Sequence, residues 1–273
     1  MTVMAAKLLL APLCVVGVSL AGRRWGMGMA GVLGGLPVVA GPILLVETLL
    51  HGPPFGAGAA AGALLALAPL TAFVVVFGRA TGRLGPIACA FCGWSAFLLG
   101  VLILSFVQPP PDLSLIFVGA CFALGLRLLP PAEEAVAAGA APPRWDLPAR
   151  AGAALLLVLG LTAVSGALGP HLSGLLAPFP IITSVLAIFT YAHAGVDQVA
   201  LLLRNFLLGF YGFAAFCFVL AISLPDLSTA AAFGAATAAA LIVQGATLVF
   251  VRDWRRPRLS RARPYPSDFS RFP

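Results

Sequence analysis

The sequence predicts an all-α fold, a polytopic membrane helical bundle of about nine transmembrane helices in two inverted repeats, five helices and then four. Three observations lead to this prediction. Of 273 residues, 61% are hydrophobic and only 9% are charged, with a mean hydropathy of +1.05. Apolar runs long enough to cross a bilayer recur along the chain. A stretch of the first half also aligns with a stretch of the second. Since so few charges cannot cover a water-facing surface, lipid must be the solvent for much of the chain.

Nine apolar runs, separated by turn residues or charge, are interpreted as membrane spans. The first run resembles a signal peptide, but Arg23 and Arg24 follow it at once and it has a counterpart at 151–168, so a retained helix is favoured. The predicted spans are 5–21, 28–50, 56–77, 87–107, 113–129, 151–168, 172–194, 199–222 and 229–251.

Composition divides the chain into four parts. Residues 1–130 form a first membrane repeat of about five helices, and 151–251 form a second repeat of about four. Between them, 131–150 is rich in Ala, Gly and Pro, which is typical of a linker. Residues 252–273 carry seven arginines and four prolines, which predicts a disordered basic tail.

The positions of the arginines predict the orientation. With nine spans, every loop arginine and the tail fall on one side, and only Lys7 falls on the other. An excess of basic residues marks the cytoplasmic side. We therefore expect an amino terminus outside, a cytoplasmic linker and a cytoplasmic carboxyl terminus. The tail is expected to bind anionic lipid headgroups rather than nucleic acid, because no basic stripe with interleaved aromatics runs along a folded domain.

Residues 30–73 align without gaps on 173–216, at a constant offset of 143. The identical pairs include Gly31 with Gly174, Pro37 with Pro180, and Gly52 with Gly195. Because predicted spans two and seven are five apart, they cross the membrane in opposite directions. If the repeat is real, its halves are related by inversion through the membrane plane, a plan common among secondary transporters.

Prolines interrupt both aligned spans. Pro37 lies in the first, and Pro178 and Pro180 lie in the second. Proline removes a backbone donor, so each helix must kink or unwind there. In transporters such interruptions line a substrate site near the bilayer midplane. The alternative is a proline kink that serves only packing.

Two pairs of ionisable residues lie near span ends at i, i+4 spacing. Glu47 and His51 end span two, while His193 and Asp197 end span seven. This spacing places each pair on one helix face, where the side chains can hydrogen-bond. Since histidine titrates near neutrality, the pairs suit proton coupling or gating. The alternative is that water and headgroups solvate both pairs.

Arg204 lies two turns into span eight, where a charge needs a reason. Its planar fork suits a carboxylate or phosphate, so it is a candidate to bind an anionic solute, with Asn205 beside it. Alternatively, Arg204 snorkels to the surface or pairs with Asp197.

Motifs of soluble enzymes are absent, and no cofactor or metal site is expected. The chain has no P-loop, GxSxG, HExxH or dinucleotide-binding fingerprint. Its three histidines lie in different segments without metal-ligand spacing. Cys89 and Cys92 form a CxxC, which inside an apolar run is interpreted as packing.

The second half resembles the GlpM family of small four-helix bacterial inner-membrane proteins. The likeness covers roughly 150–250 and is carried by the run 173–180, which ends in Phe179-Pro180, by Gly195-Val196-Asp197, and by Leu203-Arg204. The first half departs from this pattern, because Leu36 replaces the phenylalanine and Ala61 stands in place of Arg204. The resemblance implies a duplicated, fused version of such a unit in a bacterial inner membrane, and a connection with envelope polysaccharide.

By analogy with this architecture, the sequence predicts a secondary transporter or permease. It would move a small solute, anionic if Arg204 contacts it, by alternating access around the interrupted spans. The alternative is a non-transporting membrane subunit that assists envelope polysaccharide production or export. Its partner would be an envelope-assembly protein or a second copy of the chain.

Overall fold

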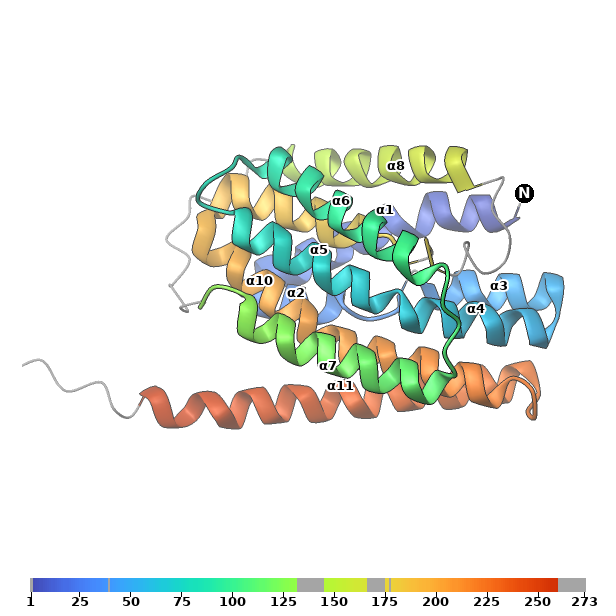
Figure 1. Cartoon of the computed structure of the whole chain (residues 1–273). Coiled ribbons are helices and arrows are strands. Elements are labelled where there is room, and N and C mark those ends of the chain that lie inside the picture. The colour runs from blue at the N-terminus through green and yellow to red at the C-terminus, as the bar shows by residue number, and fades with distance from the viewer. Residues whose placement is uncertain (1, 39, 132–144, 166–174, 177, 260–273) are drawn as a thin grey trace, which may run out of the picture.

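A computed structural model describes residues 2–38, 40–131, 145–165, 175–176 and 178–259 (Figure 1). Within these ranges every regular element is a helix, so the predicted all-α class is confirmed. In order they are α1 (Thr2–Trp25), α2 (Met27–Gly34), α3 (Ala40–His51), α4 (Pro53–Leu65), α5 (Leu67–Ala80), α6 (Pro86–Leu104), α7 (Pro111–Leu128), α8 (Asp146–Ser165), α10 (Ile181–Ser223) and α11 (Thr229–Leu259).

Five stretches of helix are long and apolar enough to cross a membrane. They are Pro53–Ala80 (α4 with α5), α6, α7, α10 and Thr229–Val249 within α11. Helices α6 and α7 expose large apolar side chains, among them Phe91, Leu99 and Ile116. Exposed side chains of this kind are expected where lipid replaces water. A multi-pass membrane protein is therefore supported, while the count of nine spans stays a prediction.

Three predicted spans differ from the helices. The span predicted at 28–50 consists of two short helices, α2 and α3, because the chain leaves the helix between Gly34 and Ala40. The spans predicted at 172–194 and 199–222 meet in α10, whose two segments join at the non-helical residue Gly195. A single glycine can reverse the chain with one unusual pair of dihedral angles, so no loop is needed between the segments.

Two helices extend into the segments that the sequence analysis assigned to the linker and the tail. Helix α8 begins at Asp146, inside the predicted linker, where its carboxylate binds an arginine of α1. Helix α11 continues to Leu259, beyond the residue at which the tail was expected to start. The remainder of the linker, 132–144, and of the tail, 260–273, lies outside the described residues.

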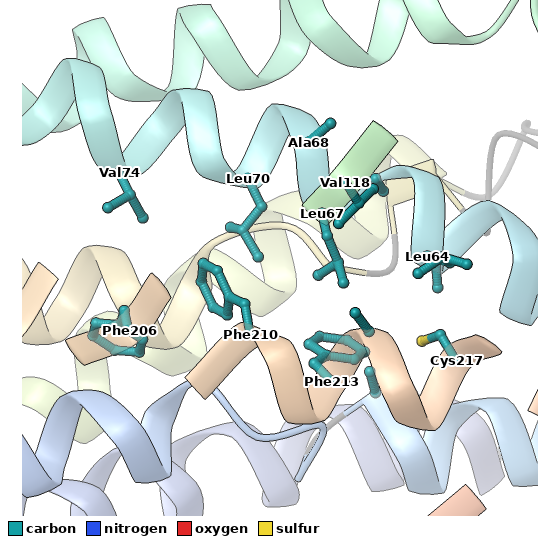
Figure 2. Close-up of a cluster of buried hydrophobic side chains, with 14 of the residues drawn as sticks. Leu64, Leu67, Ala68, Leu70, Val74, Val118, Phe206, Phe210, Phe213 and Cys217 are labelled. Carbon is teal, nitrogen blue, oxygen red and sulfur yellow. The ribbon is translucent and has the colours of Figure 1, made fainter. Parts of the chain in front are cut away.

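The centre of the core is an antiparallel pair of helices. One partner is α4 with α5, and the other is the segment of α10 after Gly195, called here the long segment of α10 (196–223). Figure 2 shows Val74, Leu70, Leu67 and Leu64 facing, in that order, Phe206, Phe210, Phe213 and Cys217. Since one set of numbers falls while the other rises, the two helices run in opposite directions.

Helices α1 and α8 form a second antiparallel pair along one side of the bundle (Figure 1). Arg23, near the end of α1, contacts Asp146 at the start of α8. Val15 and Ala154, further along each helix, are both buried in one small apolar cluster with Val185 of α10. Helices α1 and α8 therefore run in opposite directions, as the two helices of the central pair do.

Helix bounds recur at the offset found in the sequence alignment. Helices α4 and α5 together occupy 53–80, and the long segment of α10 occupies 196–223, which is 143 residues later at both ends. Helix α6 begins at Pro86, and α11 begins at Thr229, again 143 residues later. Helix α7 has no counterpart of this kind among the described helices.

Candidate functional site

The first helix break separates α2 from α3. Pro37 lies in it, half-buried, where the sequence predicted an interruption. The freed backbone is satisfied locally, because Val38 N donates to Leu36 O at 2.8 Å and Gly41 N donates to Pro37 O at 2.8 Å. Such local bonds let a helix stop inside an apolar environment.

Helix α2 packs with its backbone directly against the long segment of α10. A Cβ added at Gly31 would lie 2.5 Å from Leu202 O, and one added at Gly35 would lie 2.7 Å from Gly209 Cα. Real side chains do not approach that closely, so these positions admit only glycine without a shift of the backbone. The first break is thereby placed against the middle of the central helix pair.

The second break precedes α10. Pro178 and Pro180 are buried, and Pro180 is the N-cap residue that precedes α10. Between them, the Phe179 ring packs on Phe97 of α6, with ring centroids 5.4 Å apart. One turn later, Ser184 accepts a hydrogen bond of 2.8 Å from Trp94 Nε1. The second break is therefore held against α6.

Two aligned glycines turn the chain with nearly the same backbone angles, which Gly26, between α1 and α2, also adopts (φ 90°, ψ 161°). Gly52 has φ 90° and ψ 166°, and Gly195 has φ 84° and ψ −173°. Only glycine adopts such angles without strain. We call these the Gly52 hinge, between α3 and α4, and the Gly195 hinge, between the two segments of α10. They are the aligned glycines of the sequence repeat.

At the Gly52 hinge the predicted pair forms. Glu47 Oε2 lies 3.3 Å from His51 Nδ1, and both side chains reach solvent. The His51 ring also stacks on Phe55, with centroids 4.5 Å apart. All of these contacts lie within eight residues of one another along the chain, so this hinge is held locally.

At the Gly195 hinge the expected partner of His193 is wrong. The chain turns at Gly195, so the helix is not continuous from His193 to Asp197, and Asp197 is exposed beyond the turn. His193 Nδ1 instead lies 3.7 Å from Asp146 Oδ1, on α8. It also lies 2.9 Å from Phe189 O, to which it can donate.

Asp146 is the centre of a buried charged cluster that joins three helices. Its side chain is fully buried, and its Oδ2 accepts hydrogen bonds from Arg23 Nη2 at 2.7 Å and Arg150 Nε at 3.0 Å. Arg150 is itself 6% exposed, and its guanidinium lies over the Phe189 ring at 5.0 Å. Asp146 Oδ1 has no hydrogen-bond partner. We call Arg23, Asp146, Arg150 and His193 the Asp146 cluster.

The two arginines keep the Asp146 carboxyl ionised. Burial alone would raise its pKa, because a charge is costly away from water. The hydrogen bonds and positive charges of Arg150 and Arg23 outweigh this, and the pKa of Asp146 lies below its ordinary range. A buried anion is thus present at all physiological pH values.

Sequence reasoning missed the Asp146 cluster because it assigned Asp146 and Arg150 to a linker. One signal could have found it. Asp146 and Arg150 have the same i, i+4 spacing as Glu47 and His51, in the orientation that stabilises a helix start. The contact with Arg23, 123 residues away, has no such signal.

Tyr191 ties the Gly195 hinge to the turn between α5 and α6. Its hydroxyl accepts a hydrogen bond from Gly82 N at 2.9 Å and donates one to Leu84 O at 3.0 Å. The hinge is therefore held from two directions, by this turn and by the Asp146 cluster.

Arg204 and Asn205 both have protein partners. Arg204 Nη1 donates to the carbonyls of Leu126, Leu129 and Pro130, each at 3.2 Å, so it closes the carboxyl-terminal end of α7. Asn205 is buried and donates to Leu201 O at 2.7 Å. This geometry favours the structural reading of Arg204, though with α7 rather than Asp197, and contact with a solute stays a prediction.

Comparisons with protein-family models, curated proteins and solved structures find no match for this chain. The resemblance to the GlpM family therefore stays a prediction from the residues that carry it. In the part of the chain that the structure describes, no group of three His, Cys, Asp or Glu side chains is placed to hold a metal ion.

Proposed function

We propose that this protein is a secondary transporter of a small solute, working by alternating access between two inverted halves. One observation carries the proposal. Two 28-residue helical stretches, each following a glycine of positive φ and 143 residues apart, pack antiparallel at the centre of the core. A duplicated unit folded in opposite directions is the plan on which many transporters are built.

Inversion matters because the two halves then present equivalent structures at opposite faces of the membrane. What one half does at one face of the membrane, the other half can do at the opposite face. The antiparallel pairing of α1 with α8 supports the same relation outside the central pair. The predicted layout of five and four helices fits it, with α7 as the additional helix.

The solute site is proposed to lie between the two helix breaks, with Pro37 on one side and Pro178 and Pro180 on the other. Both breaks interrupt helices inside the bundle, and α2 brings the first against the central pair. Because Arg204 donates its hydrogen bonds to carbonyls at the end of α7, the proposed charge of the solute does not depend on that residue. Anionic and neutral solutes are both candidates.

The arginine-bearing end of the bundle is proposed to face the cytoplasm of a bacterial cell. Contacts join the ends at which the loop arginines lie: Arg23 meets Asp146, and Arg79 Nη1 donates to Leu128 O. Tyr191 and Gly82 belong to the same end. A concentration of basic residues at one end is the pattern that marks the cytoplasmic side.

Topology is the first test. Single cysteines at Pro53 and Val196, both exposed and each next to a hinge, would be placed in a cysteine-free version. A membrane-impermeant maleimide is expected to label Pro53→Cys from outside and Val196→Cys only from the cytoplasmic side. Labelling of both from the same side would overturn the inverted arrangement and remove the main support for transport.

Flux is the second test. The purified protein in proteoliposomes would be offered radiolabelled phosphate, lactate, glycine and glycerol in turn. Uptake of one of these above protein-free vesicles is expected. Pro180→Ala, which permits a helix through the second break, should reduce that uptake about tenfold or more. The matched control is Pro225→Ala, in the exposed turn after α10. An absence of uptake together with a stoichiometric protein partner on purification would favour the non-transporting envelope subunit.

A further inference from the structure

The Asp146 cluster has an unused binding capacity. Both arginines of the cluster contact Asp146 Oδ2, and the fully buried Oδ1 has no hydrogen-bond partner. The third basic side chain of the cluster is not permanently charged: His193 Nδ1 lies 3.7 Å from Oδ1. This distance permits an ion pair but is too long for a hydrogen bond.

We propose that His193 and Asp146 form a proton-binding site, and that the bound proton holds the first segment of α10 against α8 at the Gly195 hinge. Binding at this site does not depend on transport. Its role as the coupling site, with the proton as coupling ion, rests on the proposed transporter function.

The chemistry needs only a proton from water. Neutral imidazole carries one N–H and one nitrogen with a free lone pair. That lone pair takes a proton, one N–H bond forms, and the ring becomes a cation with two donors. A small rotation then brings a donor to Asp146 Oδ1. The His193 side chain is 30% exposed, so water can reach it, whereas the carboxylate lies behind it with no exposure.

The surroundings assign the titration to His193. The charged groups around His193 are Asp146 and Arg150 of α8 and Arg23 of α1. Tyr191, in the same segment of α10, contacts the α5–α6 turn, and Asp197 is exposed beyond the hinge. Asp146 remains an anion and both arginines remain cations across the physiological range. Histidine is the side chain that changes charge between pH 5 and 8.

The direction of the effect follows. At low pH the charged imidazole is attracted to Asp146, and the first segment of α10 is held. As the pH rises the imidazole loses its charge and this attraction ends, so that the first segment of α10 keeps only its other contacts, such as those of Phe189 with Arg150 and of Tyr191 with the α5–α6 turn. The site therefore favours closure of this end in acid and release in alkali.

Spin-label distances test the site without any solute. In a cysteine-free version in lipid nanodiscs, one label would replace Leu156 on α8 and the other Ala192 on α10, both exposed. A single short distance is expected at pH 5.5. At pH 8.5 the ratio of short to long distances should fall about threefold or more. A control pair at Leu50 and Ile103, at the Gly52 end, should not respond.

Variants at His193 decide the interpretation, since this partly exposed side chain can be replaced without leaving a buried charge unpaired. His193→Gln should show the pH 8.5 distribution at both pH values, and His193→Lys the pH 5.5 distribution at both. Wild-type distances that ignore pH, or a pH response that survives in His193→Gln, would overturn the proposal. Flux with pH-independent distances would leave transport standing and remove only the proton site.

Discussion

The Gly52 hinge and the Gly195 hinge have nearly the same backbone conformation, but different side-chain contacts hold them. Both glycines have φ near 90° and an extended ψ, and both begin a 28-residue helical stretch. Around Gly52, the ion pair and the ring stack are local. Around Gly195, His193 contacts Asp146 of α8, and Tyr191 contacts Leu84 in the turn between α5 and α6, each more than 40 positions away in the chain.

The difference shows that two turns with the same backbone conformation can be held by different side chains. The positions aligned with Tyr191 and His193 are Thr48 and Leu50. Thr48 is buried and bonds only to Leu44 O of its own helix, while Leu50 is exposed. The Gly195 end is therefore tied by polar contacts to distant parts of the chain, whereas the polar contacts described at the Gly52 end are local.

The largest effect on stability is expected when the buried anion at the Gly195 end is removed. Asp146→Ala leaves Arg150 and Arg23 without their partner, and we expect the free energy of unfolding to fall by about 3 kcal/mol. Glu47→Ala, in the exposed pair at the other hinge, should change it by no more than about 0.5 kcal/mol. Unfolding in mixed micelles, followed by circular dichroism, measures both. Equal losses would show that the two ends are held alike.

The pH dependence of this contribution has a defined sign. The pKa of Asp146 is lower in the folded protein than its ordinary value, so its stabilisation is present above that ordinary value, about 3.9. It is lost only as the pH falls through the lower, folded-state pKa. A stability change between pH 5.5 and 8.5 would therefore have a source other than Asp146.

A smaller effect tests whether the two hinges are the same device. Gly195→Ala and Gly52→Ala should each lower the free energy of unfolding by about 1–2 kcal/mol, because an alanine is strained at these dihedral angles. Space is not the cause, since a Cβ at Gly195 would meet nothing within 4 Å. Gly58→Ala, at an exposed helical position of α4, is the matched control and should be neutral or stabilising. Unequal losses at the two hinges would break the equivalence.

The smallest effect concerns the second tie at the Gly195 hinge. Tyr191→Phe removes one hydroxyl that both accepts from Gly82 N and donates to Leu84 O, and we expect a loss of about 1 kcal/mol. Tyr211→Phe, whose ring packs on Phe122, controls for the loss of a tyrosine hydroxyl elsewhere and should have little effect. Thermal midpoints in detergent compare the two. Identical thermal midpoints for both variants and the parent would show that the Tyr191 hydroxyl does not stabilise the Gly195 hinge.

Local signals explain what could be predicted from the sequence. Pro37, Pro178 and Pro180 cannot continue a helix, so both breaks were visible in advance. Low charge and long apolar runs indicated membrane helices, and five helical stretches of the described residues are long and apolar enough to cross a membrane. The aligned glycines Gly52 and Gly195 predicted a shared position, although not that one residue would make the whole turn.

Long-range contacts explain what could not be predicted from the sequence. The partner of His193 depends on where α8 lies in space, and Asp146 is 47 residues earlier in the chain. Arg204 looked like a charge without a reason because its partners, the end carbonyls of α7, carry no sequence signature. Every residue type has the same backbone acceptor, so a sequence pattern cannot show which carbonyls an arginine will bond. A prediction from the sequence therefore favours side-chain partners such as Asp197, which Arg204 does not use.

The close approach of α2 to α10 has a consequence for how freely the chain can vary. Gly31, Gly35 and Gly209 bring two backbones together with no side chain between them. Even a single methyl group at any of the three would have to displace main-chain atoms of the opposite helix. Chains descended from this one could change most of their lipid-facing residues at little cost, whereas these three positions have no alternative residue. In a saturation library scored for folded protein, almost no substitution at these three positions is expected to be tolerated.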